Sequence, residues 1–213
     1  MRDLSADRGL IFRITHIENV PWILAHGLHC RNSASFDPTF RNIGNVELID
    51  RRHSRKVPVP PGGTLSDYIP FYFTPRSPML YNIRTGRGGV PRVPMPDIVM
   101  FVAKLPDLVA AGVPCVVADR HAFMVAARFT SGVDGLATVD WDVLRSGNFR
   151  RDPDDPGRME RYQAEALVHG SLPASRLAGI VCHGDAQRAP LQQLVNDHQL
   201  ALKVVSRPHY FFS

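Results

Sequence analysis

The chain has 213 residues, of which 44% are hydrophobic, so it can bury one substantial core and is short for two independent domains. Its three cysteines, at positions 30, 115 and 182, are widely spaced and odd in number, which argues against a disulfide framework or a paired-cysteine metal site. The formal net charge of +5 favours a polyanionic partner without identifying one.

Neither end of the chain nor its interior resembles a membrane segment. No stretch approaches 18 consecutive apolar residues, and the polar start, residues 1–8, lacks the apolar run of a secretory signal. We therefore expect a cytoplasmic protein with no membrane contact and a single domain over residues 1–213.

The chain begins with a predicted strand, a helix and a long loop. Residues 9–15 alternate and are rich in β-branched side chains, which predicts a strand. Residues 18–25 read as a helix with Pro21 in its first turn and Gly27 as its stop. The polar stretch 30–45 predicts an irregular loop close to a functional site.

A basic helix, an aromatic strand and a third helix are expected next. The helical pattern over 46–56 must end before the prolines of 57–63, because proline cannot continue a helix. Residues 68–74 form the most aromatic strand candidate, and Ser77 suits the N-cap of a helix over 77–83. A loop over 84–96 follows. Further strands are predicted over 97–103, 114–118, 165–169, 179–183 and 201–205, and further helices over 105–111, 141–144 and 186–195.

Short strands thus outnumber long helices, and no internal repeat is visible, so the pattern predicts an α+β fold with a mixed, mostly antiparallel sheet. The glycine-rich dinucleotide and nucleotide fingerprints, the paired-histidine zinc motif and the serine-nucleophile motif are all absent. The nine histidines show no paired ligand spacing, so no metal site is expected.

Two basic features stand out. On a strand, Arg13 and Thr15 share one face, which makes that face rich in hydrogen-bond donors, unless Arg13 is simply solvated. On the predicted helix over 46–56, Arg51 would share a face with Arg55, and Arg52 with Lys56. Such like charges either meet an anionic partner or form a solvated basic face.

Two further features suggest a binding site. The run 70–81 holds more aromatic side chains than one core strand requires, so its rings could stack on a planar ligand, with core packing as the alternative for Phe71 and Phe73. Glu165 stands at the mouth of an apolar strand, where burial tends to raise a carboxyl pKa and suits proton transfer. Glu160, in the preceding charged run, is the competing candidate.

Five segments, in this order, resemble the DarT family of toxin DNA ADP-ribosyltransferases: RITHIEN, RRHSRKVPVPPGG, DYIPFYFTPRSPMLY, ADRH and QAEALVHG. The resemblance runs from about Ile11 to Phe211. It implies the ADP-ribosyltransferase fold, a split mixed, mostly antiparallel sheet with NAD held in a central cleft. NAD would be a co-substrate, and no metal is implied.

By this resemblance Glu165, rather than Glu160, is the catalytic carboxylate, and Arg51 is the second catalytic residue. Members commonly carry His where this chain has Arg13, and other branches of the superfamily carry Arg there. The resemblance assigns NAD binding to Arg13, Thr15, Asn19, Phe71 and Tyr72, and DNA binding to Arg52, Arg55, Lys56 and His121. The DNA would also pass the loop over 30–45 and the group Arg150, Arg151, Arg158 and Arg161.

The implied activity is transfer of ADP-ribose from NAD to a base in single-stranded DNA, either thymidine or guanosine, with release of nicotinamide. The implied protein partner is an antitoxin whose macrodomain removes ADP-ribose from DNA. Two alternatives stay open at this point: transfer to RNA or protein, and an inactive relative that only binds nucleic acid.

Overall fold

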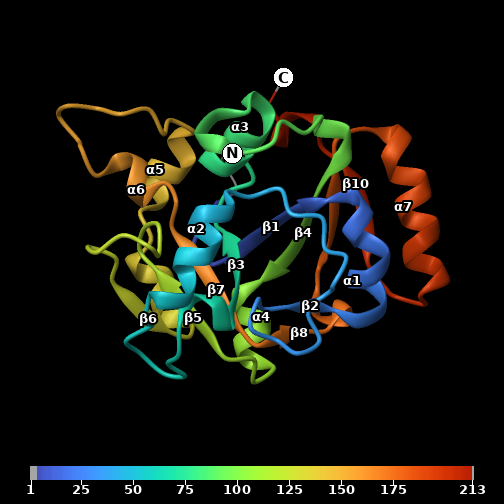
Figure 1. Ribbon diagram of the computed structural model, residues 1–213, viewed down its shortest axis with the longest axis horizontal. Helices are drawn as coiled ribbons and strands as arrows, with labels where there is room; N and C mark the ends of the chain where they lie inside the picture. The colour runs from blue at the N-terminus through green and yellow to red at the C-terminus, as the bar shows by residue number, and fades with distance from the viewer. Residues whose placement is uncertain (1–3, 213) are drawn as a thin grey trace.

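One eight-stranded sheet runs through the molecule in the order β10-β9-β4-β1-β3-β7-β5-β6 (Figure 1). The computed structural model describes residues 4–212. Within them every strand pairing is antiparallel except that of β9 with β10. The strands are β1 (Leu10–His16), β3 (Tyr68–Tyr72), β4 (Ile98–Lys104), β5 (Cys115–Ala118), β6 (Phe129–Ser131), β7 (Glu165–His169), β9 (Gly179–Cys182) and β10 (Lys203–Ser206), and β2 (Leu28–His29) pairs separately with β8 (Ser171–Leu172). The predicted α+β class is confirmed.

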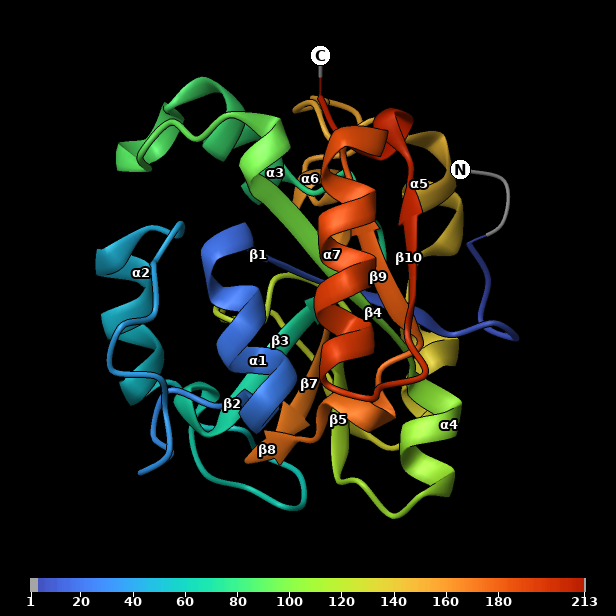
Figure 2. The same ribbon diagram turned by 90° about the vertical axis from the view of Figure 1, so that its right-hand side faces the viewer.

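Seven α-helices in this part of the chain surround the sheet. They are α1 (Val20–His26), α2 (Val46–Arg51), α3 (Pro78–Thr85), α4 (Leu105–Ala110), α5 (Trp141–Ser146), α6 (Arg158–Arg161) and α7 (Asp185–Asp197). The longest, α7, packs beside β9 and β10 (Figure 2), whereas α2 lies on the far side of α1 from α7. None of the helices over 4–212 has the length and apolarity needed to cross a membrane.

The two halves of the large sheet meet weakly between β1 and β3. These neighbouring strands share a single register pair, Phe12 with Tyr72, whereas β1 pairs with β4 along its whole length. Pro70 lies in the middle of β3 and has no N–H to donate to a neighbour. Its carbonyl instead accepts a hydrogen bond from the side chain of Arg13 at 3.2 Å. The ladder between β1 and β3 is thus reduced to a single register pair in the centre of the sheet.

Most predicted elements are present at nearly the predicted positions. The strand predicted over 165–169 has those bounds, and the helix predicted over 77–83 is α3, for which Ser77 is the N-cap as expected: its hydroxyl accepts from the Leu80 N–H. Gly27, with a φ of 86°, caps α1 as expected, because only glycine adopts this backbone readily.

The basic helix predicted over 46–56 is wrong in extent. The α-helix ends at Arg51, and the chain tightens into a 3₁₀ turn over Arg52–Ser54 before Lys56 forms an isolated bridge with Thr64. The pairs predicted to share helix faces therefore do not do so, because the α-helical repeat is lost. The sequence patterns also missed β6, α6 and the small β2–β8 sheet, which are each only two to four residues long.

Candidate active site

A cavity is lined in part by residues of β1 and β3, where the pairing between these strands is reduced to one register pair. Strands β1, β3 and β7 supply one wall through Arg13, Tyr72 and Glu165. The opposite wall comes from α2 and the loop that precedes it. That loop contributes Arg31, Phe36, Phe40, Asn42, Ile43, Gly44 and Asn45, and α2 contributes Val46, Leu48, Ile49 and Asp50. The prediction that the loop over 30–45 lies near a site is thus confirmed.

Glu165, the first residue of β7, lies at the base of this cavity and is only 1% exposed. Both terminal nitrogens of Arg52 donate to its Oε2 at 3.1 Å. Its Oε1 accepts from the backbone N–H of Ala122 at 2.9 Å. A carboxylate held by three donors has a fixed position and keeps lone pairs for a ligand hydroxyl.

The pKa of Glu165 corrects the sequence expectation. Burial alone would raise this pKa, but the charge of Arg52, the neighbouring His121 and the Ala122 N–H together bring it below its ordinary value. The predicted raised pKa is therefore wrong, and Glu165 is ionised at neutral pH. Glu165 therefore presents a fixed negative charge to any ligand in the cavity.

Arg13, on β1, and Tyr72, on β3, line the cavity beside this carboxylate. Burial, followed by the charge of Arg52, lowers the pKa of Arg13 to about 10, so Arg13 remains cationic at neutral pH. Burial and the charge of Glu165 raise the pKa of Tyr72, which keeps its phenol protonated. The cavity thus has two guanidinium groups, one carboxylate and one aromatic ring on its floor.

His121 completes this cluster as a neutral group. Its Nδ1 accepts from the Phe123 N–H at 3.2 Å and lies 3.8 Å from Glu165 Oε1. Burial and the nearby Arg52 lower its pKa. Because Nδ1 accepts a hydrogen bond, the ring proton of the neutral form is on Nε2. His121 can therefore donate a hydrogen bond into the cavity without adding charge.

The two adjacent arginines of the basic segment have different surroundings. Arg52 is largely buried and bonded to Glu165, whereas the Arg51 side chain is 59% exposed. Arg51 stacks over the Phe123 ring at 4.6 Å and lies 3.9 Å from Glu47. The structure therefore brings Arg52, and not Arg51, to the carboxylate.

Several other residues assigned from the resemblance lie outside the cavity. Among the described residues that line it, Thr15, Asn19 and Phe71 are not included. Phe71 is fully buried in the core, on the opposite face of β3 from Tyr72. Arg55 donates to the Met124 carbonyl at 2.9 Å, and Lys56 is exposed outside the cavity.

Asn19 ties the cavity loop to the sheet. Its amide donates to Thr15 Oγ1 at 2.8 Å and to the Arg41 carbonyl at 3.0 Å, and its carbonyl accepts from the Arg41 N–H at 2.8 Å. All three bonds are made by a side chain that is 2% exposed. Asn19 and Thr15 thus hold the loop over 30–45 in place.

Replacing Asn19 with Ala should therefore destabilise the protein and loosen the loop. Leaving the Arg41 N–H and carbonyl and the Thr15 hydroxyl without their partner should lower the free energy of unfolding by about 1–3 kcal/mol. Thermal denaturation measures the loss, and Asn196→Ala, on the exposed side of α7, is the matched control. An unchanged melting temperature for Asn19→Ala would contradict this role of Asn19 in holding the loop.

The directions of these pKa shifts predict the pH profile of any reaction at this site. A depressed carboxyl pKa keeps Glu165 ionised above about pH 4.5, and a depressed imidazole pKa keeps His121 neutral above about pH 6.5. Activity should consequently be flat between about pH 6.5 and 8.5, and the acid limb of Glu165 should lie below its ordinary pKa. Initial rates across this range test the expectation, which an acid limb centred near neutrality would refute.

Sequence patterns gave no sign of some cavity residues. Met79 and Asn82, one helical turn apart on α3, line the cavity and were not predicted to do so. Gln163 also lines it and donates to the Met159 carbonyl at 3.0 Å. For Gln163 the QAE segment did offer a signal, because it places this residue two positions before Glu165.

Comparisons with known proteins agree on one family. A family model described as DarT, ssDNA thymidine ADP-ribosyltransferase, matches residues 12–212. A DNA ADP-ribosyl transferase of Escherichia coli O127:H6 is 46% identical over 210 residues, which cover 99% of this chain and 96% of that protein. One from Thermus sp. (strain 2.9) is 39% identical over 167 residues, which cover 76% of each chain.

Solved structures give the same result. Thermus sp. 2.9 DarT in complex with ADP-ribosylated ssDNA superposes with a TM-score of 0.89, at 30% identity and 100% coverage of both chains. The same protein in complex with NAD+ gives a TM-score of 0.83 at 30% identity, covering 98% of this chain and 100% of that one. Thermosipho africanus DarTG in complex with ADP-ribose shares the fold at 19% identity and a TM-score of 0.77, over 95% of this chain and 51% of that one.

Proposed function

The chain belongs to the DarT family of DNA ADP-ribosyltransferases, and from this premise we propose that Glu165, Arg52 and Arg13 carry out its reaction, with thymidine as the acceptor base. The protein transfers ADP-ribose from NAD to a base of single-stranded DNA. The single observation that carries the residue assignment is the buried, ionised Glu165 held by Arg52 on the cavity floor.

The reaction breaks the bond between nicotinamide and the ribose C1′, and the nicotinamide leaves with the bonding electrons. Positive charge then develops on the ribose, and the fixed negative charge of Glu165 stabilises it at short range. A ring nitrogen of the base donates its electron pair to C1′. As this bond forms, the nitrogen becomes acidic and loses its proton, which even a carboxylate of low pKa can accept.

The two guanidinium groups have separate tasks in this proposal. Arg52 holds Glu165 in place and adds positive charge beside the cavity, where the acceptor base enters. Arg13 faces the cavity from β1 and contacts the ribose and diphosphate of NAD, since a guanidinium forms paired hydrogen bonds with such oxygens. Tyr72 provides a ring for the nicotinamide, and His121 donates to the base from Nε2.

Thymidine is proposed because the matching family model is described by that nucleoside. The test is mass spectrometry of single-stranded oligonucleotides, each with one thymidine or one guanosine among adenosines and cytidines, after incubation with the protein and NAD. A gain of one ADP-ribose on the thymidine oligonucleotide alone is the expected result. A gain on the guanosine oligonucleotide, on RNA or on protein, with none on the thymidine oligonucleotide, would reject thymidine in DNA as the acceptor.

The proposal extends to the setting of the enzyme. We place residues 1–213 in one ADP-ribosyltransferase domain acting in the cytoplasm, where DNA and NAD are both present. Since the related Thermosipho africanus protein is a DarTG, the proposed partner is a DarG-type antitoxin that removes ADP-ribose from DNA. Incubation with a DarG-type macrodomain should reverse the modification on an oligonucleotide already labelled by this enzyme, and persistence of the label would contradict the pairing.

A further inference from the structure

Helix α3 separates the catalytic cavity from a second hollow. Met79 and Asn82 face the cavity, whereas Arg84, on the same helix, lines the other hollow together with Arg92, His183 and Phe212. The glycine-rich turn after α3 links the two regions, because the Asn45 amide, on the cavity wall, donates to the Gly88 carbonyl at 2.7 Å. This turn thus lies between the cavity wall and the second hollow.

Positive charge is concentrated around this second hollow. Residues 68–96 contain Arg76, Arg84, Arg87 and Arg92 and no Asp or Glu. The ion pairs found within 4–212 involve none of these four arginines. Their charge is thus not neutralised by a carboxylate at contact distance, and Arg87 and Arg92 are exposed.

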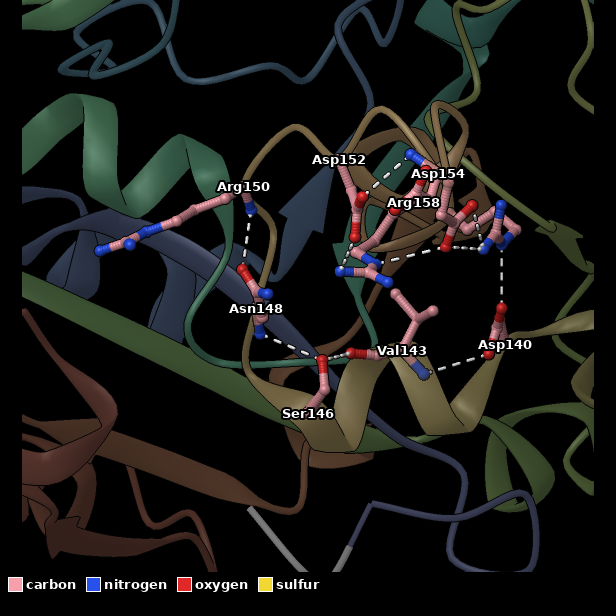
Figure 3. Close-up of polar contacts among 10 residues, drawn as sticks. Asp140, Val143, Ser146, Asn148, Arg150, Asp152, Asp154 and Arg158 are labelled. Carbon is pink, nitrogen blue, oxygen red and sulfur yellow. Dashed lines mark hydrogen bonds and ion pairs between the residues drawn. The ribbon is translucent and has the colours of Figure 1, made fainter.

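In the loop between α5 and α6, some arginines are paired with aspartates and Arg150 is not. Arg158 lies 2.7 Å from Asp152, and Arg161 lies 2.8 Å from Asp155, so both of these arginines are neutralised. The Arg150 side chain instead points away from the aspartates toward α3 (Figure 3). The aspartates of this loop thus pair with Arg158 and Arg161 and do not neutralise the arginines near α3.

Aromatic rings are interleaved with the arginines. Arg76 lies over the Phe212 ring at 4.5 Å, and Arg87 over the Tyr81 ring at 5.6 Å. Tyr81 contacts both Phe149, at 5.9 Å, and Phe212, at 5.5 Å between ring centroids. We call the set Arg76, Tyr81, Arg84, Arg87, Arg92, Phe149, Arg150 and Phe212 the α3 surface.

We propose that the α3 surface binds the single-stranded DNA that flanks the modified base, as an accessory site outside the catalytic cavity. Phosphates attract unpaired arginines, and unpaired bases stack on exposed ring faces or guanidinium planes, so the mixture fits a single strand better than an acidic protein surface. The inference rests on the DNA transfer activity and adds a second anchoring site to it.

The test compares oligonucleotide lengths. The variant Arg84→Gln, Arg87→Gln, Arg92→Gln is compared with the unaltered protein on a single strand of about 5 nucleotides and one of about 16, each with one acceptor base. The unaltered protein should bind the longer strand more tightly. The variant should lose about 10- to 100-fold of affinity for the longer strand and little for the shorter one.

Salt dependence gives a second readout. The slope of log Kd against log salt concentration should fall by about 0.7 for each phosphate that the variant no longer neutralises, and hence by about 2 for three arginines. The matched control is Arg176→Gln, Arg188→Gln, Lys203→Gln, which removes the same charge from exposed positions elsewhere. This control should bind both strands as the unaltered protein does.

The outcomes are distinguishable. Equal length dependence in the α3 variant and the unaltered protein would overturn the accessory site and leave the transfer activity intact. The same loss in the control variant would also overturn it, because the effect would then come from net charge alone. Failure of the unaltered protein to modify either strand would instead count against the activity on which the inference rests.

Discussion

Glu165→Gln should reduce transfer of ADP-ribose to DNA by roughly 1,000-fold, because the amide removes the negative charge that stabilises the developing positive charge on the ribose. The substitution keeps the shape of the side chain. Arg52 loses its anionic partner but lines an open cavity, so the free energy of unfolding should fall by only about 1–3 kcal/mol. Mass spectrometry of modified oligonucleotides measures the first effect, and thermal denaturation the second.

Glu160→Gln is the control for this prediction. Glu160 lies on α6, its side chain is 32% exposed, and its nearest cationic group is Arg120 at 3.8 Å. Its replacement should leave transfer within about twofold, as expected for a surface ion pair of small energy. Full activity in Glu165→Gln, or loss of activity in Glu160→Gln, would move the catalytic carboxylate away from β7.

Arg52→Gln should have the second largest effect, with kcat/KM for NAD lowered by about 100-fold. The two N–H groups that fix Glu165 would be lost, together with a positive charge on the cavity floor. The same change should raise the pKa of Glu165, since Arg52 is the strongest influence that lowers it. An acid limb should then move upward in pH, a shift that a purely structural role would not produce.

Arg51→Gln provides a matched control from the neighbouring residue. The Arg51 side chain is mostly exposed and stacks on Phe123, so its loss should leave kcat/KM for NAD and the acid limb nearly unchanged. Arg52→Lys should restore part of the activity, because it keeps the charge while losing the paired donors. If Arg51→Gln were the inactive variant, the assignment taken from the sequence resemblance would be correct instead.

The contrast between these arginines shows what sequence could predict. The segment from Arg51 to Lys56 is visibly basic, but composition does not show which arginine meets Glu165. Adjacent side chains point about 100° apart on an α-helix and about 120° apart on a 3₁₀ turn, so Arg51 and Arg52 cannot both face Glu165. Which of them does so follows from how α2 is placed against β7, and this placement exists only in the fold.

The strands were easier to predict than the short connections. β7 and β4 are buried on both faces, so they read as continuous apolar runs, and their positions follow from hydrophobicity. The family resemblance assigned both Phe71 and Tyr72 to NAD binding and did not show which of them faces the cavity. The choice depends on the register of β3 against β7, in which Tyr72 lies opposite Glu165.

The lowered pKa of Glu165 lay beyond sequence reasoning for a related reason. Burial at the start of an apolar strand favours a raised pKa, and that part of the argument holds. The groups that reverse it, Arg52 and the Ala122 N–H, lie 113 and 43 residues away along the chain. Only the fold brings them within hydrogen-bond distance.

Pro70 removes one possible hydrogen bond between the two halves of the sheet. Any other residue at this position has an N–H, which could add to the single register pair between β1 and β3. A search for stabilising substitutions would therefore favour replacing Pro70. Closer pairing of these strands would shift the Pro70 carbonyl that holds the Arg13 side chain, so a gain in sheet stability at this position would come with a changed placement of a cavity residue.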